Sequence, residues 1–112
     1  MKSKKITLII HRLRRKWRNK GFSPIAINTG HCDLFAEELE QNYPLGKAIW
    51  GDDHHKLFRT KVDHEGHCFF ALQGRYYDSE CPKGVTSPDK LPFYQRANQN
   101  GEFNYRKYYK SA

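Results

Sequence analysis

A predicted β-hairpin at residues 67–78 constrains the fold more than any other part of the sequence. Residues 67–72 are rich in β-forming side chains, residues 75–78 contain paired tyrosines, and Gln73-Gly74 between them suits a two-residue turn. A two-residue loop determines how the flanking strands pair, and strand alternation then determines which side chains share a face. The sequence therefore predicts an antiparallel sheet with a defined register.

One face of this hairpin carries a histidine and two acids. With the turn at Gln73-Gly74, Phe69 pairs with Asp78 and His67 pairs with Glu80. The side chains that share this face are His67, Phe69, Ala71, Tyr76, Asp78 and Glu80. Diagonal neighbours on a face lie about 7–8 Å apart at the backbone, a gap that an imidazole and a carboxylate can close. Either Asp78 or Glu80 could therefore orient the ring of His67.

A helix is predicted from Cys32 to about Asn42, because apolar residues recur at helical spacing and acids concentrate in the first turns. Cys32 lies in the first turn, where unpaired backbone N–H groups and the positive end of the helix dipole favour a thiolate. The turn before it allows close backbone approach. The amide of Cys32 and one side chain, Asn28 or His31, could thus form an oxyanion hole.

Positive charge is concentrated at the N-terminus. Residues 1–20 carry nine of the 20 Lys and Arg and no Asp or Glu, so the rest of the chain sums to −1, with 11 basic against 12 acidic residues. Apolar residues three or four positions apart predict an amphipathic helix over residues 4–19, which Gly21 is placed to end. The apolar stripe consists of Ile6, Ile10, Leu13 and Trp17. The basic face is either simply solvated or a surface through which residues 2–20 meet nucleic acid, an acidic protein or an acidic membrane.

The remaining segments give weaker signals. Residues 22–31 contain a proline, a glycine and cap-type residues, and are predicted to approach the next helix in extended form. Residues 44–66 mix glycines with charged residues, which predicts a loop with one strand. Repeated prolines after Glu80 argue against a long regular element, and residues 103–109 are expected to form a last strand. The prediction is an α+β fold, with N-terminal helices packed on a small antiparallel sheet.

Length and composition limit the class of protein. The 112 residues have room for one domain, 1–112, whose modest core relies on aromatic side chains, since these make up 14% of the chain. The apolar run at 6–10 is too short for a signal-peptide core or for a membrane span of roughly 20 residues. Three cysteines are an odd number, which excludes complete disulfide pairing. We therefore expect reduced thiols, a cytoplasmic location and no transmembrane segment.

The order of a cysteine at a helix start, a histidine on a strand and an acid on the next strand resembles the papain-like and transglutaminase-like cysteine hydrolase superfamily, including NlpC-type peptidases. The resemblance covers residues 28–78. It is carried by Asn28-Thr29-Gly30-His31-Cys32-Asp33-Leu34-Phe35-Ala36, Gly66-His67-Cys68-Phe69-Phe70 and Gly74-Arg75-Tyr76-Tyr77-Asp78.

The resemblance implies a papain-like core, within residues 28–80, in which the cysteine-bearing helix packs on an antiparallel sheet. It also implies that the acid follows the histidine on an adjacent strand, which favours Asp78 over Glu80. The expected triad is Cys32 as nucleophile, His67 as base and Asp78 as the residue that orients the base. The implied activity is hydrolysis or acyl transfer on an amide, ester or thioester bond of a protein or peptide-like substrate.

Other cysteines and histidines point less clearly to a site. Cys68 should face away from His67 into the core, and Cys81, which precedes a proline, is expected to be structural, with a regulatory thiol as the alternative. A zinc site would have to combine Cys32, His67, Cys81 and one of His54 or His55, but no Cys-x-x-Cys or His-x3-His pair anchors it. We therefore expect neither a metal nor another cofactor.

Two other functions remain open. One is a non-enzymatic module that binds nucleic acid through the basic helix and the aromatic, basic tail at residues 105–110, where stacking and phosphate contacts would combine. The other is a protein of papain-like fold that binds a partner without turnover. Salt dependence separates nucleic-acid binding from thiol chemistry, because only the former weakens steeply as salt rises.

Overall fold

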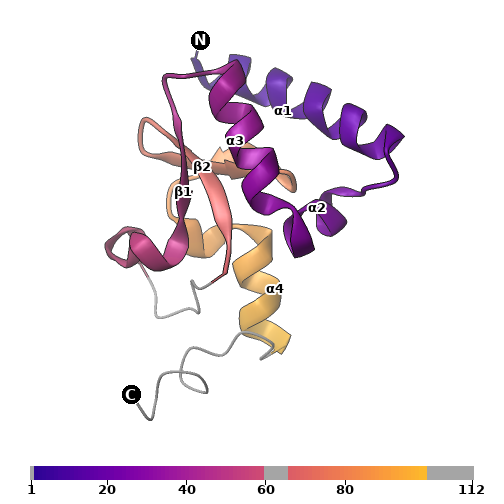
Figure 1. Cartoon of the computed structure of the whole chain (residues 1–112). Helices are drawn as coiled ribbons and strands as arrows, with labels where there is room; N and C mark the ends of the chain where they lie inside the picture. Colours follow the sequence, from indigo (N-terminus) through magenta and orange to yellow (C-terminus); the bar gives the residue numbers. More distant parts are fainter. Residues whose placement is uncertain (1, 60–65, 101–112) are drawn as a thin grey trace.

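The computed structural model describes residues 2–59 and 66–100. Its main elements, in chain order, are α1 (Lys2–Asn19), α2 (Pro24–Gly30), α3 (Cys32–Asn42), β1 (Lys47–Trp50), β2 (Cys68–Leu72), β3 (Arg75–Asp78), β4 (Cys81–Val85) and α4 (Pro92–Asn100). Short 3-10 turns occur at Gly51–Asp53, His55–Leu57 and Pro88–Lys90. The predicted α+β class is confirmed (Figure 1). None of the described helices is long and apolar enough to cross a membrane.

The four strands form one antiparallel sheet in the order β1-β2-β3-β4, each strand beside its neighbour in sequence. The predicted register of the central hairpin is confirmed next to the turn, where Leu72 pairs with Arg75, Ala71 with Tyr76 and Phe70 with Tyr77. The predicted pairing of Phe69 with Asp78 and of His67 with Glu80 would continue this register, but it lies beyond these three pairs. The turn between them has positive φ at both residues, 49° at Gln73 and 78° at Gly74, as a type I′ hairpin requires. Its twist matches that of the strands it joins.

Two hydrophobic clusters fill opposite faces of the sheet. The first joins α1, α2 and α3 to the face of β2 and β3 that carries Phe70 and Tyr77. The second joins the other face, which carries Phe69 and Tyr76, to α4. Alternation along the strands separates the two sets of side chains. The helices that hold Cys32 therefore cover one face, and α4 covers the face of His67.

Helix α1 packs through the predicted stripe, and its end is well defined. The N–H of Phe22 donates to the carbonyl of Trp17 and that of Gly21 to the carbonyl of Arg18, which together form a Schellman motif. Gly21 supplies the required positive φ of 96°. The rings of Phe22 and Trp17 meet edge to face at 5.6 Å. The Trp17 indole and Lys16 both bind the carboxylate of Glu38, which fastens α1 to α3.

The bounds predicted for the cysteine-bearing helix are confirmed at Cys32–Asn42, but the extended approach predicted before it is wrong. Residues Pro24–Gly30 form α2 instead. The Ser23 hydroxyl accepts a hydrogen bond from the N–H of Ala26, and Pro24 occupies the first turn. Ser as N-cap followed by Pro is a helix-start signal, which was available in the sequence.

The region after Glu80 holds more regular structure than its prolines suggested. Strand β4 contains Pro82 at the edge of the sheet, where a missing N–H is tolerated. Helix α4 begins at Pro92, whose fixed φ suits a first helical position. The last strand predicted at 103–109 lies outside the described residues.

Candidate active site

Cys32 lies at the start of α3, with its side chain 8% exposed. The N–H of Cys68, at the start of β2, donates to the sulfur of Cys32 at 3.4 Å. Cys32, Ala36 and Cys68 form a small apolar cluster between α3 and the sheet. The sulfur of Cys32 therefore lies at the start of β2, next to His67, and accepts a hydrogen bond from the backbone there.

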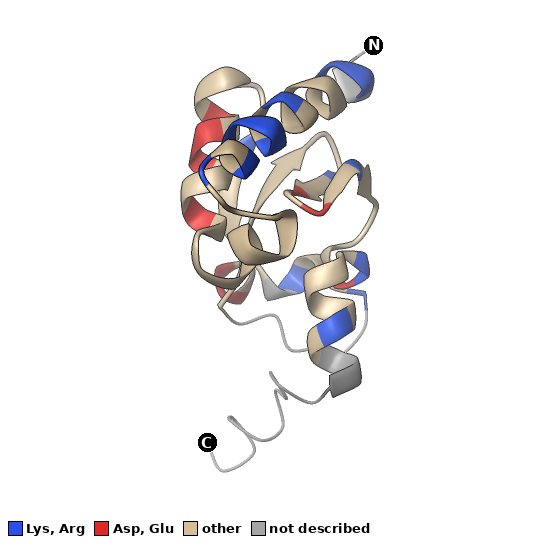
Figure 2. Cartoon of the chain, turned by 90° about the vertical axis from the view of Figure 1, so that its right-hand side faces the viewer, with Lys and Arg blue, Asp and Glu red and all other residues tan. Residues whose placement is uncertain are grey.

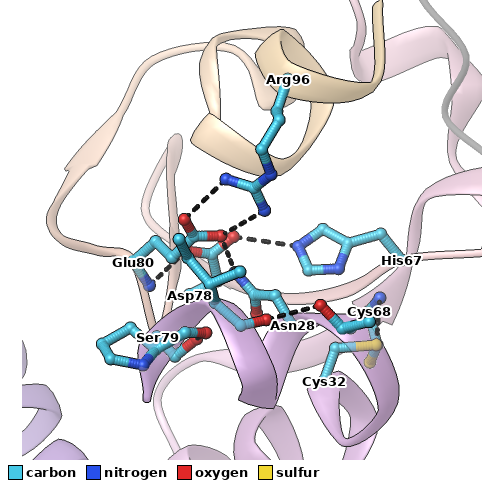
Figure 3. Close-up of polar contacts among 11 residues, drawn as sticks. Asn28, Cys32, His67, Cys68, Asp78, Ser79, Glu80 and Arg96 are labelled. Carbon is cyan, nitrogen blue, oxygen red and sulfur yellow. Dashed lines mark hydrogen bonds and ion pairs between the residues drawn. The ribbon is translucent and has the colours of Figure 1, made fainter. Parts of the chain in front are cut away.

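His67 and Asp78 form a buried pair on the face of the hairpin predicted for them. The Nε2 atom of His67 lies 2.9 Å from Oδ2 of Asp78, and the two side chains are 0% and 3% exposed. Because an ionised carboxylate can only accept, Nε2 carries the hydrogen and donates it. Figure 3 shows the ring between Asp78 and the two cysteines.

The surroundings of His67 favour its charged form. Burial by itself lowers the pKa of His67, but the hydrogen bond with Asp78, the proximity of the Cys32 sulfur and the negative charges of both partners outweigh it, so the pKa of His67 is raised. The Nδ1 atom has no hydrogen bond of ordinary geometry among the described residues. The ring is therefore anchored at Nε2 and has Nδ1 available for proton exchange.

Asp78 is itself held in place at both carboxylate oxygens. While Oδ2 accepts from His67, Oδ1 accepts a hydrogen bond of 2.9 Å from the N–H of Glu80. The next side chain, Ser79, donates to the carbonyl of Pro24 at 2.8 Å, which fastens the end of β3 to the start of α2. These contacts leave the carboxylate of Asp78 little freedom to turn away from the imidazole.

The structure distinguishes the two acids that the hairpin register left open. Glu80 does not contact His67; its carboxylate accepts a hydrogen bond from Nδ2 of Asn28 at 2.8 Å and pairs with Arg96. The two guanidinium nitrogens of Arg96 lie 2.8 and 2.9 Å from its two oxygens. Asp78 is therefore the acid beside the imidazole, and Glu80 joins α2 to α4 (Figure 3).

The two candidates for an oxyanion side chain lie in different surroundings. Asn28 is 3% exposed and belongs to the polar network around Glu80. His31 instead packs on the aromatic cluster of α1, with its ring 4.7 Å from that of Phe22 and 5.8 Å from that of Trp17. Asn28 is the one that lies within the site.

Helix α4 contributes residues that sequence reasoning missed. The ring of Phe93 stacks on His67 at 4.1 Å and 13°, and Tyr94 meets the imidazole edge on at 5.4 Å. Arg96 reaches Glu80 from the same helix. The apolar spacing of Phe93, Tyr94 and Ala97 behind Pro92 could have predicted the helix, but no local signal indicates that it covers His67.

The other thiols are unsuited to nucleophilic chemistry near neutral pH. Burial, reinforced by the negative charge of Cys32, raises the pKa of Cys68 to about 12. Burial and the charge of Asp78 raise the pKa of Cys81 to about 11. Cys68 is 3% exposed and faces the core, as predicted. Within residues 2–59 and 66–100, no three His, Cys, Asp or Glu side chains converge as a metal site.

Comparisons of the chain with protein-family models, curated proteins and solved structures find no significant match.

Proposed function

We propose that the protein is a cysteine-dependent acyl hydrolase or acyltransferase that acts on amide, ester or thioester bonds, with the papain-like arrangement that its sequence resembles. One pair of contacts carries the proposal: a buried imidazole is anchored to Asp78 by one nitrogen, and the backbone N–H of the next residue, Cys68, donates to the sulfur of Cys32. Nucleophile, base and orienting acid in this relation are the parts needed for covalent acyl transfer.

The first half of the reaction forms a thioester. The sulfur of Cys32, having given its proton to Nδ1 of His67, attacks the carbonyl carbon of the substrate. The backbone N–H of Cys32 and the side-chain amide of Asn28 stabilise the negative oxygen that results. The tetrahedral intermediate then collapses, the bond to the leaving group breaks, and that group takes the proton from His67.

The second half releases the acyl group. His67 removes a proton from an incoming water or amine, which attacks the thioester carbon, and the sulfur of Cys32 leaves. Asp78 keeps the ring in the tautomer that exposes Nδ1 in both halves and stabilises the imidazolium between them. Water as acceptor gives hydrolysis, and an amine gives transfer.

Turnover of p-nitrophenyl acyl esters and of a matched acyl-peptide amide library tests this proposal. We expect Cys32→Ala and Cys32→Ser to lose at least about 10³-fold in kcat/KM, because the nucleophile is removed. His67→Ala should lose nearly as much. Cys81→Ser is the matched control, since its thiol lies outside the triad, and it should keep wild-type turnover. Activity of Cys32→Ala equal to the wild type would refute the proposal.

A second candidate function is binding of nucleic acid through α1. Its apolar stripe is buried against the core, and Figure 2 shows the Lys and Arg positions along the helix in blue. Of these, Lys16 is paired with Glu38 of α3. Among the described side chains of α1, the exposed cations are Lys4, Lys5, Arg12, Arg15, Lys16 and Arg18, and the exposed Lys20 lies just beyond the end of the helix. The tail at 105–110 that was predicted to assist lies outside the described residues.

Salt titration tests this second function. If about four of these cations contact phosphates of a DNA duplex, log Kobs should fall with log salt at a slope of about −4. Charge reversal at Arg15 and Arg18 should reduce both the affinity and the slope, while acyl transfer stays unchanged. Binding that does not depend on salt would exclude this role.

A further inference from the structure

We propose that Glu80 and Arg96 are positioning residues that hold the side-chain amide of Asn28 in the orientation that donates to the oxyanion. This inference rests on the proposed function. The side chain of Asn28 ends in a carboxamide, which carries a carbonyl oxygen and an NH2 group. Only the NH2 group can donate a hydrogen bond that stabilises a negative oxygen. A neighbouring contact must therefore fix the orientation of this amide.

The contacts of Asn28 show what decides it. Its Nδ2 donates to Oε2 of Glu80 at 2.8 Å, while its Oδ1 is buried and has no hydrogen-bond partner among the described residues. The bond to Glu80 is thus the contact that distinguishes the two ends of the amide. A carboxylate accepts and never donates, so the NH2 end must face Glu80. One N–H of Nδ2 is used there, and in this proposal the second N–H is the oxyanion donor.

Glu80 is in turn held by Arg96. The bidentate pair has contacts of 2.8 and 2.9 Å, and the Glu80 side chain is 10% exposed. Planar, two-point pairing of this kind fixes the rotation of the carboxylate as well as its charge. Arg96 belongs to α4, which also stacks Phe93 on His67. One helix therefore supports both the base and the oxyanion donor.

The network also connects the two catalytic functions through the backbone. The N–H of Glu80 donates to Oδ1 of Asp78, and the carboxylate of Glu80 accepts from Asn28. The same residue thus contacts both the acid behind His67 and the amide of Asn28 (Figure 3). Replacement of the Glu80 side chain leaves the backbone contact in place, so the role toward Asn28 can be tested alone.

Two reactions of Cys32 separate positioning from general structural support. Alkylation by iodoacetamide occurs at a saturated carbon and forms no oxyanion, whereas acylation by p-nitrophenyl acetate does. We expect Glu80→Gln and Arg96→Lys to lower kcat for acylation about 10- to 100-fold with KM little changed. Loss of the donor itself in Asn28→Ala should cost about 10²–10³-fold. Alkylation of Cys32 should stay within about twofold in all three variants.

A double-mutant comparison shows whether Glu80 acts through Asn28. In the Asn28→Ala background, Glu80→Gln should have no further effect on acylation, because the group it orients is gone. Arg12→Lys, a conservative change on exposed α1, is the matched control for Arg96→Lys. Thermal melts show whether each variant is folded. If Glu80→Gln does not fold, Arg96→Lys tests the same role.

Three outcomes would overturn the inference: unchanged acylation in both Glu80→Gln and Arg96→Lys, equal losses in acylation and alkylation, or additive losses with Asn28→Ala. Failure of the proposed function looks different, since it shows as full turnover in Cys32→Ala whatever happens at Glu80.

Discussion

Solvent exposure and thiol ionisation predict different orders of alkylation rate for the three cysteines. Cys81 is half-buried, whereas Cys32 and Cys68 are only 8% and 3% exposed. Access alone would therefore make Cys81 react first. The reactive species is the thiolate, however, and the environments of the three sulfurs differ in how far they stabilise a negative charge.

The raised pKa values of Cys68 and Cys81 determine how little of each is present as the reactive thiolate. With pKa values of about 12 for Cys68 and about 11 for Cys81, about one molecule in 10⁵ and one in 10⁴ carries the respective thiolate at pH 7. Cys32 has His67 to receive its proton and the N–H of Cys68 as a donor. Because of these two neighbours, we expect Cys32 to react at least about tenfold faster than either.

Limited labelling with isotopic iodoacetamide between pH 5 and 10, followed by peptide mass spectrometry, measures the three rates together. Cys81 and Cys68 should react about tenfold faster for each unit of pH up to their pKa values. Cys32 should react ahead of both at pH 7. In His67→Gln the advantage of Cys32 should vanish while the other two rates stay unchanged. Labelling that follows exposure, with Cys81 first at pH 7, would refute the reasoning.

Two further predictions concern the base and the fold. In Asp78→Asn, His67 loses the carboxylate that raises its pKa, so the alkaline limb of the acyl-transfer pH profile should move to lower pH; a limb at the wild-type position would contradict this. In the wild type this raised pKa stabilises the fold fully below about pH 6.5, and the stabilisation should fade as pH rises through the folded-state value, which urea melts against pH will show. Gly84 and Gly74 both have a left-handed φ, of 77° and 78°. A Cβ added at Gly84 would lie 2.5 Å from the ring of Tyr77, whereas one added at Gly74 would meet no atom within 4 Å. Gly84→Ala should therefore destabilise by about 1–3 kcal/mol more than Gly74→Ala, and equal losses would show that the ring moves aside freely.

The parts of the site that rest on local sequence signals could be predicted. The register of the β2-β3 hairpin follows from Gln73-Gly74, and with it the shared face of His67 and Asp78. The start of α3 at Cys32 follows from helical spacing and acid in the first turn. Both signals act over a few residues, so that tertiary structure has little room to override them.

The parts that depend on long-range packing could not be predicted. The register alone left Asp78 and Glu80 as equal candidates, and only the family resemblance favoured Asp78. The contacts that engage Glu80 elsewhere come from Asn28 and Arg96, which lie 52 and 16 residues from it. The stacking of Phe93 on His67 likewise depends on how α4 lies against the sheet. Helix α2 differs from these, because the signal at Ser23 was present and was outweighed by the glycine and the other cap-type residues around it.

The central claim is that Cys32 carries the acyl group, and acid-quenched mixing with p-nitrophenyl acetate tests it most directly. Intact-mass and peptide analysis should find one acetyl group on Cys32 within the first turnover, declining as water releases it, and none in Cys32→Ala. An acetyl group on Cys81 or on a lysine instead, or release of p-nitrophenol without any adduct on Cys32, would contradict the account.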